Sequence, residues 1–189
     1  LSWKSFLDVK DIEDPHCTIE DIEKNFKGII LLTGSFDSLI GKLFFKNLTE
    51  EVMILLKRFK KVFKEDIYIE IQRHNDEGEK LFEKFLINTS KNLTLPIIAT
   101  QEVYYLDKDM FEAHDAYLCI GEKTYVNVKE RRKYTDQHYL KSSEEMYELF
   151  KDLPDALENN ENFPFRVSYR PKNSLPVLPN IQTSKTENI

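Results

Sequence analysis

The stretch Ile67-Tyr68-Ile69-Glu70-Ile71-Gln72 decides the fold, because isoleucine occupies every second position in it. Successive side chains of a strand point to opposite faces of a sheet, so this alternation predicts a strand. Its three isoleucines would share one face, and Tyr68, Glu70 and Gln72 would share the other. Two short apolar runs, 29–33 and 96–100, predict buried strands before and after it.

Apolar residues between and after these runs recur at helical spacing, which predicts amphipathic helices. Thr49 is expected to be the N-cap of one helix, and Ser142 and Glu145 form an S-x-x-E capping box that opens another. Strands that alternate with helices favour an α/β fold around a mostly parallel sheet or barrel. The predicted helices cover about 36–44, 49–62, 81–86, 111–118 and 142–150.

Composition and charge argue against some classes of function. The 189 residues are 41% hydrophobic, enough for one domain with a core, and the net charge is −6. An acidic chain without a strong basic stripe argues against a domain that itself grips nucleic acid. The mixed run 129–133 is the best local candidate for a phosphate contact, although a solvated loop is the simpler interpretation.

The cysteines and the hydropathy pattern bear on the cellular compartment. Cys17 and Cys119 lie far apart and neither belongs to a CxxC pair, which is typical of a reduced protein of the cytoplasm. No apolar run approaches the ~20 residues that span a bilayer. We therefore predict a cytoplasmic protein that does not contact a membrane.

Polar side chains follow each predicted strand, where the reactive groups of parallel α/β folds gather. Glu70, His74 and Glu102 lie at two of these ends and could supply oxygen and nitrogen ligands to a divalent metal. From spacing alone, a structural role is the simpler interpretation, with Glu70 paired to Arg73 or to a lysine at the sheet edge.

The remaining polar residues are weaker candidates for a catalytic or metal-binding role. His114 lies on an apolar helix face and is expected to be a core or boundary residue, whereas His16 and His138 are expected at the surface. Ser35 follows a glycine after a strand, but no G-x-S-x-G elbow surrounds it, so the sequence predicts no catalytic nucleophile there.

Six segments, in the same order and spacing, resemble the α subunit of bacterial DNA polymerase III. The resemblance implies a partial PHP-type distorted β/α barrel, with residues 1–160 as the second half of the PHP domain and its N-terminal half missing. Residues 161–189 would be an irregular linker toward the polymerase palm. The six segments are 28–34, 68–74, 95–100, 112–120, 139–146 and 149–159.

The resemblance also bears on the metal site, which in this family holds ions such as zinc or manganese. Glu70 and His74 match the family's E-x-Q-x-H segment, but the family's Asn-Asp-x-His reads Gln-Glu-Val-Tyr at 101–104. Tyr104 cannot replace a neutral imidazole ligand, whereas Glu102 could still coordinate. The resemblance therefore implies a degenerate site that is kept as a scaffold.

For function, the resemblance implies a fragment of a replicative DNA polymerase that copies DNA from deoxynucleoside triphosphates with magnesium at palm carboxylates outside this chain. The segment itself would be structural and would dock the proofreading exonuclease subunit, in a replicase that also contains the sliding clamp. An active metal-dependent phosphoesterase or proofreading nuclease is the alternative, and a stand-alone adaptor is a third. Expressed alone, the chain is expected to be poorly stable, because strand 29–32 would have an unpaired edge.

Overall fold

A computed structural model describes residues 1, 5, 15–173 and 175 of the chain. In chain order its elements are α2 (Ile19–Lys24), β1 (Leu31–Leu32), α3 (Leu39–Phe45), α4 (Thr49–Phe63), β2 (Ile67–Ile71), α5 (Glu79–Leu93), β3 (Ile97–Ala99), the 3-10 helix η1 (Lys108–Met110), α6 (Phe111–Gly121), α7 (Ser143–Phe150), α8 (Pro154–Asn162) and the 3-10 helix η2 (Phe163–Arg166).

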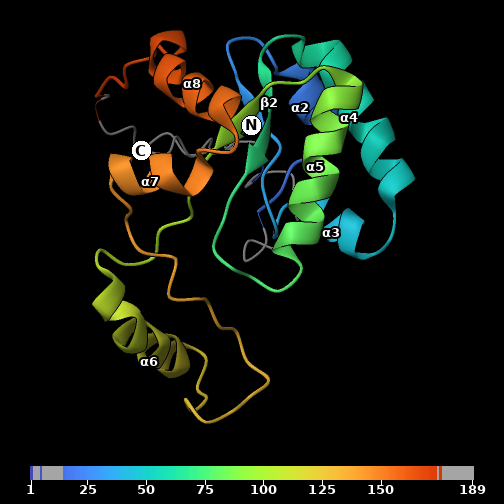
Figure 1. The fold of residues 1–189 in the computed structure, drawn as a ribbon. Coiled ribbons are helices and arrows are strands. Elements are labelled where there is room, and N and C mark those ends of the chain that lie inside the picture. The colour runs from blue at the N-terminus through green and yellow to red at the C-terminus, as the bar shows by residue number, and fades with distance from the viewer. Residues whose placement is uncertain (2–4, 6–14, 174, 176–189) are drawn as a thin grey trace, which may run out of the picture.

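The three strands form one open parallel sheet in the order β1-β2-β3. Leu31 is in register with Ile67, and Ile69 with Ile97. Helices α4 and α5 lie on one side of the strands, and α7 and α8 lie on the other (Figure 1). The predicted α/β class and parallel sheet are confirmed, and the open sheet is consistent with part of a PHP-type barrel.

Strand β2 is the centre of the core and is covered on both faces. Ile67, Ile69 and Ile71 are at most 1% exposed, and Tyr68 on the opposite face is only 5% exposed. The ring of Tyr68 makes an edge contact with Phe163 of η2, at 5.8 Å between centroids. The predicted alternation is therefore real, but its second face is also closed, by the segment around α8 and η2.

The outer edge of β3 is covered by two side-chain amides of α8. Asn160 accepts a hydrogen bond from the Ala99 N–H (3.1 Å) and donates one to the Ala99 carbonyl (2.7 Å). Asn159 donates to the Ile97 carbonyl (2.8 Å). The sequence did not lead us to predict α8, although Pro154 at its first turn is a helix-start signal.

The observed ends of several elements differ from the predicted ones, because local hydrogen bonds set where each element begins. The first strand is shorter than 29–33, because Gly28 adopts a positive φ of 72° and the Ile29 N–H bonds back to Phe26. Helix α3 begins after Ser38, whose side chain accepts the Gly41 N–H, so Phe36 lies outside it. Thr49 is the first residue of α4 and its N-cap is Leu48, so that prediction was wrong. The capping box of Ser142 is confirmed.

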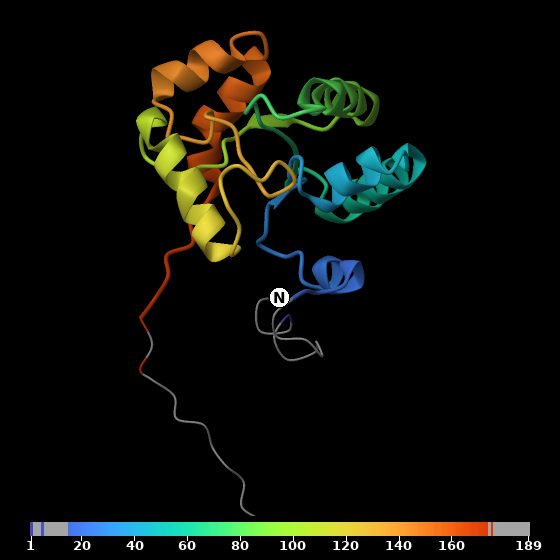
Figure 2. The same cartoon turned by 90° about the horizontal axis from the view of Figure 1, so that it is seen from below.

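Helix α6 and the loop that follows it extend away from the sheet, on the side of α7 and α8 and opposite α3 and α4 (Figures 1 and 2). The loop is anchored by Arg131, whose guanidinium makes a two-pronged contact with Asp115 of α6 (2.5 and 2.6 Å). Most of the run 129–133 is a solvated loop as predicted, but the Arg131 side chain is only 3% exposed. Across the described ranges, no helix combines the length and apolarity that a membrane span needs.

Candidate metal site

The Glu70 carboxylate joins the carboxyl ends of all three strands. It accepts hydrogen bonds from the Gly34 N–H after β1 (3.0 Å) and from the Thr100 hydroxyl after β3 (2.5 Å). The Glu70 N–H in turn donates to the Thr33 hydroxyl (3.0 Å). These partners are neutral, and Arg73, the partner expected from the sequence, pairs with Glu83 and Asp152 instead.

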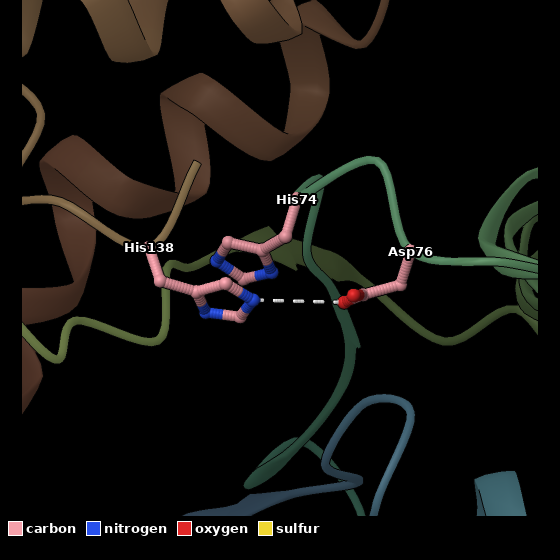
Figure 3. A group of neighbouring side chains, drawn as sticks. All are labelled: His74, Asp76 and His138. Carbon is pink, nitrogen blue, oxygen red and sulfur yellow. Dashed lines mark ion pairs between the residues drawn. The ribbon is translucent and has the colours of Figure 1, made fainter. Parts of the chain in front are cut away.

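Three side chains beyond this edge form a group that could hold a metal ion: His74, Asp76 and His138. One ligand atom of each lies within 4.8 Å of the others. The two imidazole rings stack at 4.0 Å between centroids with 7° between their planes, and the Asp76 carboxylate faces them (Figure 3). Both histidines are almost fully buried, at 2% and 1% exposed.

Hydrogen bonding fixes the tautomer of His138. Its Nδ1 lies 3.1 Å from the Glu102 carbonyl, which can only accept, so Nδ1 carries the proton of the neutral ring. Its Nε2 then presents a lone pair, is buried, and has no hydrogen-bond partner in the described part of the chain. This nitrogen lies 3.7 Å from the Asp76 carboxylate. A lone pair and a carboxylate that face each other repel, so the pair fits a proton or a cation between them.

His74 fits an ion less well. Its Nε2 accepts the Glu102 N–H (3.1 Å), so in the neutral ring Nδ1 carries the proton. Burial, and then the nearby His138 and Lys141, lower the pKa of His74 to about 4, so the ring is neutral at pH 7. Coordination through Nδ1 would move its proton to Nε2, against the Glu102 N–H. That hydrogen bond would have to break, so His138 and Asp76 are the better ligands.

Glu102 joins the two histidines through its backbone rather than its side chain. Its carboxylate accepts a hydrogen bond from the Tyr104 hydroxyl at 2.5 Å. Burial and this contact raise the pKa of Tyr104 above its ordinary value, so the phenol keeps its proton and does not act as a ligand. Of the three predicted ligands, the structure thus places His74 in the group that could hold a metal ion and Glu102 beside that group, while Glu70 bonds to the strand ends.

Sequence reasoning missed Asp76 and His138. The prediction that His138 lies at the surface was wrong: its ring packs on His74 and within 5.3 Å of the Tyr104 and Tyr134 ring centroids. Asp76 stands two residues after His74, a spacing visible in the sequence, whereas His138 comes from a distant segment with no spacing signal.

The other two histidines lie where they were predicted. His16 is exposed, and His114 is half-buried at a boundary, where it stacks on Tyr104 at 5.6 Å.

A small cavity of about 210 Å³ adjoins the three ligand candidates. Its walls also include Ser35 and Lys133, a hydroxyl and a cation that suit a phosphate oxygen. Further carboxylates on the walls, those of Asp37, Glu79 and Glu102, favour a cation over an anion.

Comparison with known proteins shows the family to which the chain belongs. Residues 2–74 match the PHP domain family. The chain is 32% identical over 188 residues, all of its length, to the DNA polymerase III subunit alpha of Caulobacter vibrioides. The chain is homologous to DNA polymerase III α subunits. The corresponding subunit of Rickettsia bellii is 34% identical over 89% of the chain, and that of Borreliella burgdorferi is 33% identical over 96%.

This homologue covers only a small part of its relatives. The chain spans 16% of the length of the Caulobacter protein, 14% of the Rickettsia protein and 17% of the Borreliella protein. The PHP match ends at His74, so it includes Glu70 but not Asp76, Glu102 or His138. The resemblance read from the sequence is thereby confirmed, while the expected boundaries at 160 and 161 remain predictions.

Proposed function

We propose that this chain is the PHP-domain region of a bacterial replicative DNA polymerase α subunit and serves there as a scaffold. Homology over the whole chain supports this function. DNA synthesis from deoxynucleoside triphosphates would take place with magnesium at palm carboxylates outside this chain. The engagement of the Glu70 carboxylate by neutral donors from β1 and β3 supports the scaffold role, because those hydrogen bonds fix the strand ends rather than a ligand.

In this proposal the region docks the proofreading exonuclease subunit, within a cytoplasmic replicase that includes the sliding clamp. The exposed apolar side chains of α6 offer a surface for a protein partner: Tyr117 is 72% exposed and Ile120 is 77% exposed. A Tyr117→Ser/Ile120→Ser variant of the full-length subunit tests this surface. We expect weaker binding of the exonuclease subunit in calorimetry, and no change for Leu81→Ser on α5, which is exposed to a similar degree (64%).

A metal-dependent phosphoesterase is the second candidate function, favoured by one observation. The buried Nε2 of His138 has a lone pair with no hydrogen-bond partner among the described residues and faces Asp76 at 3.7 Å. An imidazole nitrogen and a carboxylate, from His138 and Asp76, are ligands that zinc and manganese accept. A bound ion would polarise a phosphate oxygen or activate a water, while Asp76 and His138 would hold it in place.

Metal analysis of the full-length subunit separates the two functions, together with phosphoesterase assays of the wild type, His138→Gln and Glu70→Ala. The scaffold role predicts no stoichiometric metal and no hydrolysis that depends on these residues. Stoichiometric zinc or manganese, lost together with hydrolysis in His138→Gln, would instead establish the region as a second enzyme. If Glu70→Ala keeps the metal, Glu70 is not a ligand.

A further inference from the structure

Four lysines gather at the amino edge of the sheet, the edge opposite the metal-site candidates. Lys57, Lys60, Lys61 and Lys64 follow one another at i, i+3, i+4 and i+7 on the last turns of α4 and at its C-cap, so they share one helix face. They line a cavity of about 640 Å³. Tyr68 at the start of β2 lies on its wall as well.

These four positive charges outnumber the one carboxylate on the cavity wall, that of Glu65. No ion pair within 4.0 Å joins any of the four to a carboxylate in the part of the chain that the structure describes. Lys60 donates a hydrogen bond to the Leu93 carbonyl at the end of α5, so the Lys60 side chain caps that helix. Lys57, Lys61 and Lys64 are exposed, and like charges at such spacing repel each other. Their arrangement fits an external anion.

Arg166 connects this cavity to a second one of about 500 Å³ on the same edge, because it lines both. Its guanidinium lies 5.4 Å from the centre of the Tyr68 ring and pairs with Asp66 at 2.5 Å. Tyr169 lines the second cavity and is 81% exposed, and the neighbouring Phe165 is 89% exposed. The edge thus presents lysines at one end and uncovered aromatic rings at the other.

We propose that this amino edge binds single-stranded nucleic acid, with phosphates at Lys57, Lys61 and Lys64 and a base stacked on Tyr169. A positively charged groove with aromatic side chains is the arrangement by which proteins hold single strands without sequence preference. The exposed rings favour a single strand over a duplex, whose bases are already stacked, and over an acidic peptide, which has no base to stack. This binding does not depend on the metal site or on the polymerase reaction. The proposal can therefore be wrong while the proposed function is right, and the reverse.

Lysine footprinting of the full-length subunit tests the proposal directly. Acetylation of each lysine is measured by mass spectrometry with and without a twenty-residue thymidine oligonucleotide. We expect the oligonucleotide to protect Lys57, Lys61 and Lys64, while Lys42 of α3 and Lys46 at its C-cap, both exposed, react as before. Unchanged acetylation of the α4 lysines under saturating oligonucleotide would overturn the proposal. So would protection by poly-glutamate but not by the oligonucleotide, which would make the edge a site for an acidic protein segment.

Salt titration of oligonucleotide binding gives a quantitative check. A Lys57→Gln/Lys61→Gln/Lys64→Gln variant loses three phosphate contacts. Each contact to a single strand contributes ~0.7 to the slope of log affinity against log salt concentration, so the slope of the variant should be shallower by about 2. A matched Lys42→Gln/Lys46→Gln/Lys84→Gln variant, with the same change in charge, should keep the wild-type slope. Equal slopes for the two variants would refute the assignment. Tyr169→Ser should weaken binding about tenfold without changing the slope.

Discussion

Replacement of Glu70 by alanine should loosen the carboxyl edge of the sheet by an amount that the hydrogen bonds set. The carboxylate accepts one bond from Gly34 and one from Thr100. A bond to a charged acceptor contributes about 1.5–3 kcal/mol, and the site is half-buried, so we expect a loss of about 3 kcal/mol. Glu70→Gln keeps one acceptor oxygen for Gly34 and should cost about 1 kcal/mol.

Hydrogen exchange followed by mass spectrometry in the full-length subunit measures this loss locally. A loss of about 3 kcal/mol corresponds to exchange on the order of 100-fold faster in segments 67–72 and 97–101 for Glu70→Ala. Glu70→Gln should stay within about tenfold of the wild type. Wild-type exchange in both variants, combined with loss of a bound divalent ion from both, would refute this reasoning and make Glu70 a metal ligand.

Three further predictions concern His74, α8 and α7. The folded pKa of His74, about 4, lies below its ordinary value of 6.5, so the unfolded state binds more protons between these values. Stability should therefore be complete above pH 6.5 and fall by up to about 3 kcal/mol as the pH drops toward 4, a loss that a His74→Gln denaturation series should lack. Asn160→Ala should cost about 2 kcal/mol and expose the Ala99 amide to exchange, and Asn160→Asp should also destabilise, because its second carboxylate oxygen would face the Ala99 carbonyl in place of the donor. Ser142→Ala should destabilise α7 by about 1 kcal/mol, seen as faster exchange in its first turn, whereas Ser143→Ala should not.

The sequence predicted the elements that local periodicity defines. Strand 67–71 and its alternating faces followed from the isoleucine pattern, and helices α4 to α7 followed from apolar spacing and capping. Alternation of strands and helices was enough to predict the parallel sheet. The predicted boundaries were wrong where a single side chain sets the end of an element, as Ser38 does at the start of α3. A periodic pattern of apolar residues does not resolve the one or two residues that a cap decides.

The candidate site was only partly predictable because its members come from separate segments. His74 stands at the end of a predicted strand, and the structure places it in the group that could hold a metal ion. His138 reaches that group through a loop held by the contact of Arg131 with Asp115, and no periodicity describes such a loop. The prediction that the chain lacks a strong basic stripe was wrong at α4, where four lysines share one helix face. The net charge averages over the whole chain and does not show a local cluster.

The asparagines of α8 determine at which edge of the sheet a further strand can pair. A neighbouring strand would bond to the Ala99 N–H and carbonyl, but Asn160 already occupies both, and Asn159 occupies the Ile97 carbonyl. An added strand would have to displace these amides at β3, whereas β1 is the other edge of the described sheet. Strands that complete a barrel should therefore join beside Leu31 and Leu32, and so should any second molecule that associates by strand pairing. A proline or a charge placed beside β1, not beside β3, is the substitution that should suppress such association.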